Sequence, residues 1–393
     1  MKQQILIISG AIVILILVAV WVYLLFFGTP KSVQDVLVKL GTVGEEEVNN
    51  TEENKEPTIN TTGPNLRQLT TKSVAGFTEI NNPDSGAANI PIIYYAEKGT
   101  GHVFSINLET GEENKISGTT VAETNHAEID PNGDWIVFSK HTNTKNTNLT
   151  IGALDKETGE TALEEPGLAV NSFTLSQDGQ NLLYTTTDSN GLNGHNLNLT
   201  TKKDTIVFSL PFHEATIQWG NSAEDTHYVY PKPSYLLEGY LYKVKNNKID
   251  RLPASGFGFS ALANDKMIIY STTNNRENNT SVFNLETLEK SELPITLLPE
   301  KCILGTNTTS LICAEDSLTT LPFNFPDEWY KGGMNFKDSL WLIDASELKT
   351  TLLADTFKQT SRELDIVDLY LGDSEYAVYF INKIDNTLWM YEL

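Results

Sequence analysis

The chain has 393 residues, with 51 acidic and 28 basic side chains and a formal net charge of −23 at pH 7. A surface this acidic repels phosphate backbones and anionic headgroups, which argues against binding to nucleic acid or to the surface of anionic membranes. The length exceeds that of one small domain and suits a single repeat architecture with appended segments.

An apolar segment without charged residues runs from Ile5 to Phe27. As a helix it would extend about 34 Å, enough to cross the hydrocarbon core of a bilayer. It ends in large residues instead of the small-x-small pattern of a cleavable signal peptide, so we expect an uncleaved membrane anchor behind a cytoplasmic stub of residues 1–4. Because the long acidic remainder is typical of a translocated domain, we expect a single-pass protein of the cell membrane with an extracytoplasmic C-terminal part.

Residues 28–64 form the predicted juxtamembrane segment and linker. Val33, Val36, Leu37 and Leu40 have helical spacing, which fits a short helix on the membrane or against a partner, or a helical continuation without a partner. Residues 41–64 are rich in Glu, Asn and Thr and nearly free of apolar residues, so they predict a disordered acidic tether.

Residues 65–393 read as strands only. The sequence IDPNGDWIVF at 129–138 recurs in degenerate form as LSQDGQNLLY at 175–184, LANDKMIIY at 262–270 and LGDSEYAVYF at 371–380. The turns recur about every 43 residues, the length of a four-stranded propeller blade. These turns are centred on Pro83, Asn132, Asp178, Asn221, Asn264, Asn307 and Asp373. The pattern predicts an all-β, seven-bladed β-propeller with strands A to D in each blade, counted outward from the hub.

The two ends of this region predict how the ring closes. The last repeat supplies A, B and C strands at residues 366–371, 377–381 and 387–393, and then the chain stops without a D strand. Residues 65–70 (NLRQLT) resemble a D strand and have no blade of their own. We therefore expect the N-terminal strand to complete the last blade, which removes the exposed edges of an open array.

The stretch from Ser176 to Tyr184 (SQDGQNLLY) resembles the repeat signature of TolB-like and WD-repeat-like bacterial propellers. The Trp-Asp pair that ends a eukaryotic WD blade is absent. The resemblance implies a propeller fold and an extracytoplasmic protein-binding scaffold, although such propellers host many functions.

The predicted B–C loops are longer than the A–B and C–D turns, and we expect them to form the variable face, pointing away from the membrane. They are residues 140–147, 186–194, 231–238, 272–280 and 315–336. The last is an insertion in the sixth blade that carries Phe323, Phe325, Trp329, Tyr330 and Phe336. These aromatic residues form a binding platform or pack the insertion onto its own propeller. Tyr235, in another B–C loop, is a further candidate binding residue.

Other candidate sites are few. Cys302 and Cys313 oppose each other on a predicted hairpin, which favours a structural disulfide over two buried thiols. His126, His213 and Glu214 are expected near the hub entrance, as a polar funnel for a small ligand or as hydrogen-bonded channel lining. The sequence contains no G-x-S-x-G, H-E-x-x-H or C-x-x-C motif, so we expect no metal and no cofactor. Residues 130–134 resemble the start of a calcium loop but lack its remaining ligands, and they predict a β-turn.

Two functions fit these features. The first is a membrane-anchored scaffold that is not an enzyme and that binds a protein or cell-envelope partner through the B–C face. The second is an envelope glycan hydrolase or lyase with its site at the funnel, where two carboxyl groups would have to converge.

Overall fold

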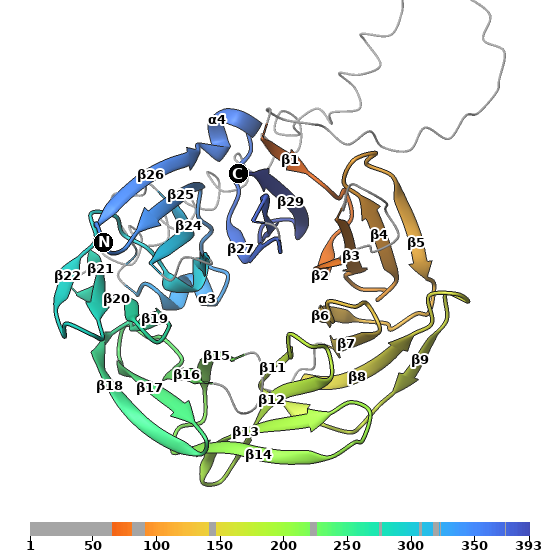
Figure 1. The fold of residues 1–393 in the computed structure, drawn as a ribbon, viewed down its shortest axis with the longest axis horizontal. Helices are drawn as coiled ribbons and strands as arrows, with labels where there is room; N and C mark the ends of the chain where they lie inside the picture. The colour runs from red at the N-terminus through yellow and green to blue at the C-terminus, as the bar shows by residue number, and fades with distance from the viewer. Residues whose placement is uncertain are drawn as a thin grey trace, which may run out of the picture. The chain divides into compact units, whose positions relative to one another are not determined.

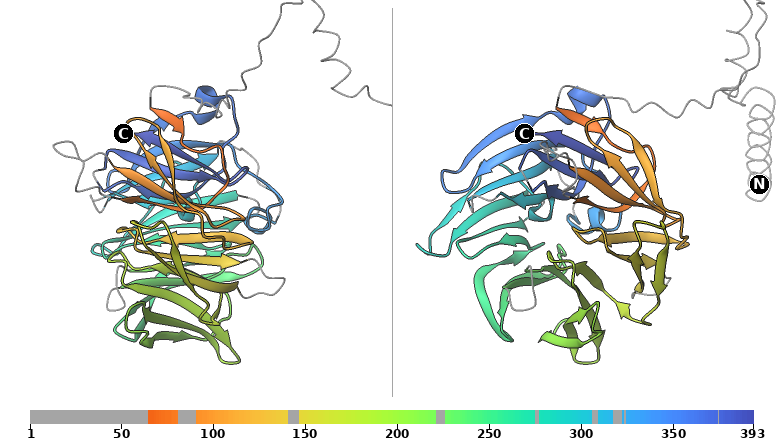
Figure 2. Two further views of the ribbon diagram at one scale, coloured as in Figure 1. Left: turned by 90° about the vertical axis from the view of Figure 1, so that its right-hand side faces the viewer. Right: turned by 45° about the vertical axis from the view of Figure 1, so that its right-hand side comes forward.

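The computed structural model describes residues 65–80, 91–140, 147–220, 226–274, 277–305, 309–316, 322, 324–373 and 375–393. These residues form seven β-sheets that follow one another around a ring (Figures 1 and 2). The predicted seven-bladed propeller is therefore confirmed. In the described part of the chain, no helix combines the length and apolar character needed to cross a membrane. The predicted anchor and linker lie outside the described residues.

The first three blades contain β2–β5 (Val74–Ile80, Ile92–Glu97, Val103–Asn107, Glu113–Ser117), β6–β10 (Thr124–Ile129, Trp135–Lys140, Thr147–Leu154, Thr161–Glu164, Ala169–Val170) and β11–β14 (Ser172–Leu175, Asn181–Asp188, Gly191–Asn198, Asp204–Leu210). The next two contain β15–β18 (Ala215–Gln218, His227–Pro231, Glu238–Lys245, Lys248–Phe257) and β19–β22 (Ser260–Ala263, Met267–Asn274, Glu277–Asn284, Lys290–Glu292). Blade 6 contains β23–β26 (Cys302–Leu304, Ser310–Asp316, Asp338–Asp344, Lys349–Ala354), and blade 7 contains β27–β29 (Ile366–Leu371, Ala377–Asn382, Thr387–Glu392) with β1 (Leu66–Gln68).

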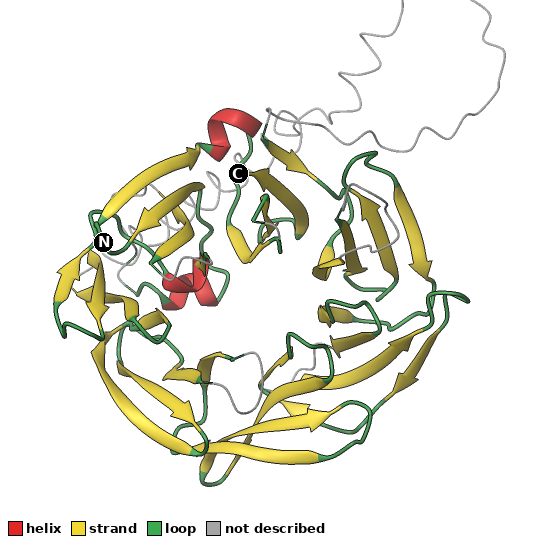
Figure 3. Cartoon of the chain, in the orientation of Figure 1, coloured by secondary structure: helices red, strands yellow, loops and turns green. Residues whose placement is uncertain are grey.

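Helical structure among the described residues is confined to single turns around blade 6 (Figure 3). The 3-10 turn η1 (Pro299–Lys301) precedes the blade. Helix α3 (Asp327–Tyr330) lies within the insertion between β24 and β25, and α4 (Thr356–Thr360) connects blade 6 to blade 7. The insertion therefore occupies the predicted B–C position.

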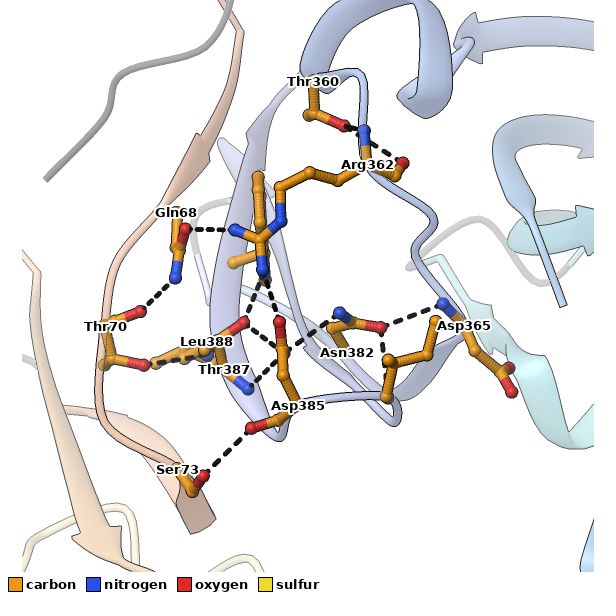
Figure 4. Close-up of polar contacts among 12 residues, drawn as sticks. Gln68, Thr70, Ser73, Thr360, Arg362, Asp365, Asn382, Asp385, Thr387 and Leu388 are labelled. Atoms are coloured by element: carbon orange, nitrogen blue, oxygen red, sulfur yellow. Dashed lines mark hydrogen bonds and ion pairs between the residues drawn. The ribbon is translucent and has the colours of Figure 1, made fainter. Parts of the chain in front are cut away.

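Ring closure follows the prediction. Strand β1 pairs antiparallel with β29, with Leu66 opposite Tyr391 and Gln68 opposite Trp389. Leu66 is fully buried in a cluster that spans blades 6 and 7. Around this joint, Thr70 accepts a hydrogen bond from the Leu388 N–H, and Arg362 donates one to Gln68 (Figure 4). The first and last strands of the propeller are thus joined by both backbone and side-chain contacts.

The apolar core lies between neighbouring blades as well as within them. One cluster joins Val74, Ile93 and Tyr95 of blade 1 to Tyr379 and Met390 of blade 7. Another joins Met267 and Ile269 of blade 5 to Leu311 and Ile343 of blade 6. Neighbouring blades therefore bury apolar side chains against each other, as expected for a propeller.

The A–B turn at residues 130–134 is a β-turn, as predicted. The Asp130 carboxylate accepts hydrogen bonds from the N–H groups of Asn132, Asp134 and Trp135, at 3.0, 2.6 and 2.6 Å. Gly133 has a φ of 69°, a conformation that glycine adopts readily. The Asp130 carboxylate therefore organises the backbone of this turn.

The predicted length difference between the B–C and A–B loops is wrong for two blades. In blade 3, β12 continues to Asp188 and β13 begins at Gly191, so most of the predicted loop 186–194 is paired strand. In blade 5, β20 continues to Asn274 and β21 begins at Glu277. These hairpin ends have the composition of loops because their paired strands contain polar residues, such as Thr186, Asn193, Thr272 and Asn279. Blades 3 and 5 therefore contribute short hairpin ends to the B–C face, and blades 4 and 6 contribute longer described connections.

Candidate functional site

Cavities lie along the inner A strands of the ring. One of about 710 Å³ is bordered by Glu128, Ser176, Tyr370 and Asp373, near the A–B turns. A second of about 600 Å³ is bordered by Glu300, Trp329, Tyr330, Asp368 and Lys383, near the opposite ends of the A strands. Ile217 borders both cavities, which places them along one central channel.

A charged cluster lies where blades 7, 1 and 2 meet, and two of its members, Glu128 and Asp368, border the two cavities. His126 Nε2 lies 3.3 Å from Glu128 Oε1, and both residues belong to β6. Asp368 of β27 and Lys98 of the blade 1 B–C loop interact electrostatically with His126. Burial acts to lower the pKa of His126, but the carboxylates of Glu128 and Asp368 outweigh it and raise the pKa above its ordinary value. His126, which was predicted near the hub entrance, is thus part of a mixed-charge cluster.

Asp368 occupies a distorted position in β27. Val367 pairs with Ile381 and Tyr370 pairs with Tyr379, so two residues on β27 stand opposite one residue on β28. Asp368 has a φ of 52°, which is uncommon for a residue other than glycine. β-bulges next to functional sites often redirect a side chain, and here the bulge presents Asp368 to the channel. Asp368 keeps solvent-exposed surface, but the surrounding residues desolvate its carboxyl and raise its pKa; Glu128 adds to this effect and His126 opposes it.

The insertion packs against the propeller through its aromatic side chains. Phe325, Trp329 and Phe336 are 1%, 6% and 7% exposed and form a cluster with Leu298. Tyr330 is half-buried at the edge of this cluster. Phe323 lies outside the described residues. Of the two arrangements expected from the sequence, Phe325, Trp329 and Phe336 adopt the one in which the insertion packs onto its own propeller. Helix α3 lies on the inner side of the ring (Figure 1).

A buried ion-pair network anchors this insertion. Lys301 Nζ lies 2.6 Å from Asp338 Oδ2 and 2.8 Å from Asp365 Oδ1, and all three side chains are at most 2% exposed. The Trp329 indole N–H donates to both oxygens of Asp365, at 3.0 and 3.2 Å. Burial raises the pKa of Asp338 to about 6, while the Lys301 ammonium opposes that shift. Trp329 is thus a structural anchor for α3.

Tyr235 lies in a B–C loop that the insertion holds in place. Its backbone N–H donates to Asp327 Oδ2 at 2.8 Å, and the Ser234 hydroxyl donates to Asp327 Oδ1 at 3.1 Å. Tyr235 itself is half-buried, whereas Leu236 and Leu237 are 66% and 62% exposed. The sequence pattern predicts Tyr235 as a binding residue but not the adjacent leucines. Their consecutive positions in a polar loop are the feature that could have indicated an exposed apolar patch.

His213 lies apart from His126. It is exposed and borders a cavity of about 450 Å³ together with Glu214, Lys232 and Tyr330. The His213 carbonyl accepts a hydrogen bond from the Thr187 hydroxyl at 3.0 Å. The structure therefore does not bring the two histidines into one site.

Cys302 and Cys313 form a disulfide across the first two strands of blade 6, where they are register partners. Within the described ranges, no three His, Cys, Asp or Glu side chains are placed to hold a metal ion. The disulfide joins the strand that follows η1 to the strand that leads into the insertion.

No family model and no curated protein sequence matches this chain. Among solved structures, the fold is similar to an oligogalacturonate lyase in complex with manganese, with a TM-score of 0.56 and 11% identity over 86% of this chain and 95% of that one. An oligogalacturonate lyase of Vibrio parahaemolyticus has a TM-score of 0.55 and 11% identity, over 86% and 97% of the two chains. Kuenenia stuttgartiensis hydrazine synthase has a TM-score of 0.50 and 9% identity, over 82% and 97%. At these identities the similarity shows the β-propeller fold alone.

Proposed function

We propose that the chain is a membrane-anchored, extracytoplasmic β-propeller that binds a protein partner of the cell envelope through its B–C face. The observation that carries this proposal is an apolar surface patch formed by Leu236, Leu237 and Phe257, which we call the blade 4 patch. The three side chains are 66%, 62% and 51% exposed. Phe257 is placed beside the two leucines because it is the register partner of Glu238.

The blade 4 patch is presented on a well-braced loop. Asp327 of α3 accepts hydrogen bonds from Ser234 and Tyr235, and the Gly258 N–H donates to the Ser234 carbonyl at 2.9 Å. A loop that is already ordered loses less conformational entropy on binding. Contiguous exposed apolar residues bordered by polar ones are typical of protein-interaction sites. The insertion in blade 6 therefore supports a binding surface on blade 4.

Crosslinking in the native envelope tests this proposal. A photo-crosslinking residue replaces Leu236 in the full-length chain, and the captured proteins are identified. The same residue at Leu288, an exposed leucine in the C–D turn of blade 5, is the matched control. We expect one partner to be captured from position 236 only and the double variant Leu236→Ser, Leu237→Ser to weaken its binding at least tenfold. Equal capture from both positions would contradict the proposal.

The anchor and its orientation are supported by the uncharged run from Ile5 to Phe27. Protease treatment of intact cells tests this part separately. We expect digestion of the propeller from outside and protection of the N-terminal stub. Protection of the whole chain in intact cells, with digestion after lysis, would overturn the extracytoplasmic assignment.

A second candidate function is an enzyme that acts on envelope glycans in the channel. The bulged position of Asp368, facing His126 and Glu128, favours this candidate, since acid–base chemistry needs convergent titratable groups. Purified full-length chain is incubated with polyuronates and with envelope glycan, and new chain ends are measured. Activity that Asp368→Asn removes and Asp250→Asn retains would support the enzyme; no turnover of either substrate class would reject it.

A further inference from the structure

A cavity of about 290 Å³ lies between blades 5 and 6 on the B–C face and shares no lining residue with the blade 4 patch. We call it the inter-blade cavity. Strand β21 contributes Glu277 and Asn278, and the facing blade contributes Glu315, Asp316 and Asp338. Phe325 and Phe336 of the insertion supply apolar lining. Its volume is near the lower end of the range for small-molecule sites.

The charge around this cavity is strongly negative. Among the described residues that line it, four carry carboxylates, Glu277, Glu315, Asp316 and Asp338, and one carries an ammonium, Lys301. That ammonium is already engaged by Asp338 and by Asp365, which lies outside the lining. A positively charged ligand would therefore reduce the repulsion of Glu315 by Asp316 and Asp338.

Two buried acceptor oxygens of the lining have no hydrogen-bond partner among the described residues, Asn278 Oδ1 and Asp338 Oδ1. Asn278 and Asp338 are 8% and 1% exposed. The Asn278 Nδ2 group donates to the Leu297 carbonyl at 3.0 Å, which fixes the amide orientation and leaves its oxygen unused. Asp338 Oδ2 accepts from Lys301 and from the Ile366 N–H, which leaves Oδ1. Buried acceptors without donors are rare, and their presence here indicates a missing donor.

We propose that the inter-blade cavity binds a small organic cation that carries N–H donors, a primary ammonium or a guanidinium. The carboxylates supply the attraction for positive charge, and the two unpartnered oxygens accept its hydrogen bonds. The aromatic lining packs on its alkyl part. Since no three side chains of the described residues are placed around a metal position, the donor set suits an extended organic cation better than a point ion.

Calorimetry on the full-length chain in detergent tests the proposal, with putrescine and agmatine as probes. Choline, a cation without N–H donors, is the control ligand. We expect saturable one-to-one binding of at least one probe and at least tenfold weaker binding of choline. Failure of both probes to bind, or choline binding as tightly as they do, would overturn the proposal.

Two variants place the binding in this cavity. Glu315→Gln is expected to weaken binding at least tenfold, while Glu289→Gln, an exposed glutamate at the start of the outer strand of blade 5, leaves it unchanged. Equal affinity in both variants would assign the cation to another site. Thermal melting of Glu315→Gln checks its folding, and Glu277→Gln, at the exposed rim, provides a second variant with a smaller expected loss.

The pH dependence gives an independent readout. Glu315 interacts with Asp316, Asp338 and the indole of Trp341, and Glu277 and Lys301 line the same cavity. Burial, with repulsion from Asp316 and Asp338, raises its pKa to about 7. The carboxylate that attracts the cation therefore forms as the pH rises, and binding should be tighter at pH 8 than at pH 6. Equal affinity at the two pH values in the unmodified chain would contradict the assigned role of Glu315.

Discussion

Arg362 donates a hydrogen bond to Gln68 at 2.7 Å, joining residues that are 294 positions apart in the sequence. The same guanidinium forms an ion pair with Asp385 (Figure 4). It also lies over the Trp389 ring, 5.2 Å from its centroid. Arg362 follows α4 in the connection from blade 6 to blade 7. One side chain therefore links that connection to the strand that closes the ring.

Replacing Arg362 by alanine should loosen β1 without unfolding the propeller. The ion pair is partly exposed, so we expect a global loss of only about 1 kcal/mol. Amide hydrogen exchange at Leu66–Gln68 should accelerate more than exchange in β28. Arg362→Lys keeps the charge but cannot reproduce the planar fork, and it should give an intermediate rate. Unchanged exchange in β1 would show that backbone pairing alone secures the closing strand.

Leu66 supplies the apolar part of the closure. Leu66→Ala should lower the free energy of unfolding by about 2–5 kcal/mol, because a fully buried side chain leaves a cavity against Phe380 and Trp389. Urea denaturation measures the change. Leu288→Ala, where the side chain is 69% exposed, is the matched control and should change stability by less than about 0.5 kcal/mol. Similar losses of unfolding free energy in the two variants would show that Leu66 does not stabilise the ring closure.

Lys301, in the turn that leads into blade 6, should be sensitive to substitution. Lys301→Met leaves the buried carboxylates of Asp338 and Asp365 without their closest cation, and we expect a loss of about 3–5 kcal/mol. Adding Asp365→Asn should recover part of the loss, since one uncompensated charge is removed. Lys248→Met removes an exposed ion pair and serves as the control, with little expected change. A double variant less stable than Lys301→Met would contradict this explanation.

Most of the fold could be predicted from the sequence because its signals are local and repeated. Asn-Gly and Asp-Gly turns between apolar strands give the blade period, and the resemblance of residues 65–70 to a D strand predicts the place of β1 beside β29. The hairpin ends of blades 3 and 5 were misassigned because Thr and Asn in paired strands have the same composition as loops. Strand pairing, which decides between them, depends on residues distant in sequence.

The candidate sites were harder to predict for the same reason. The sequence places His126 near the hub, but its neighbours Lys98 and Asp368 come from other blades, and the bulge at Asp368 has no local signature. Trp329 was a candidate binding residue, and its anchoring contacts come from Asp365 and Lys383, which follow in later strands and loops. Whether an aromatic residue is displayed or buried depends on such long-range contacts.

Asp327, in the insertion of blade 6, should control how well the loop that carries the blade 4 patch is ordered. Asp327→Asn keeps the shape of the side chain but weakens its acceptance of hydrogen bonds from Ser234 and Tyr235, because an amide supplies a single acceptor oxygen. We expect several-fold weaker partner binding and faster amide exchange at residues 234–237, with little change in thermal melting. Asp250→Asn, on the outer strand of blade 4, is the control. Unaltered partner binding with faster loop exchange would show that the patch does not need a pre-ordered loop.

Stability should depend on pH through Glu315 in a way that opposes ordinary acid denaturation. The pKa of this carboxyl is raised from 4.5 to about 7 in the folded chain. Between these values the folded state binds more protons than the unfolded state, so the free energy of unfolding decreases as the pH rises from 4.5 to 7. Glu315→Gln removes the titrating group. In amine-free buffer the variant should therefore be more stable than the unmodified chain at pH 8, by about 1–2 kcal/mol after allowance for solvent screening.

Urea denaturation of both proteins at pH 4 and pH 8 measures this difference. The two stabilities should converge at pH 4, below the unfolded-state pKa of 4.5, where Glu315 is protonated in both the folded and the unfolded chain. Carboxylates with lowered pKa, such as Asp155, Asp178 and Asp344, lose their contributions at lower pH and affect both proteins equally. Parallel pH profiles would mean that Asp316 and Asp338 do not repel the charge on Glu315, and would remove the electrostatic basis of the inter-blade cavity.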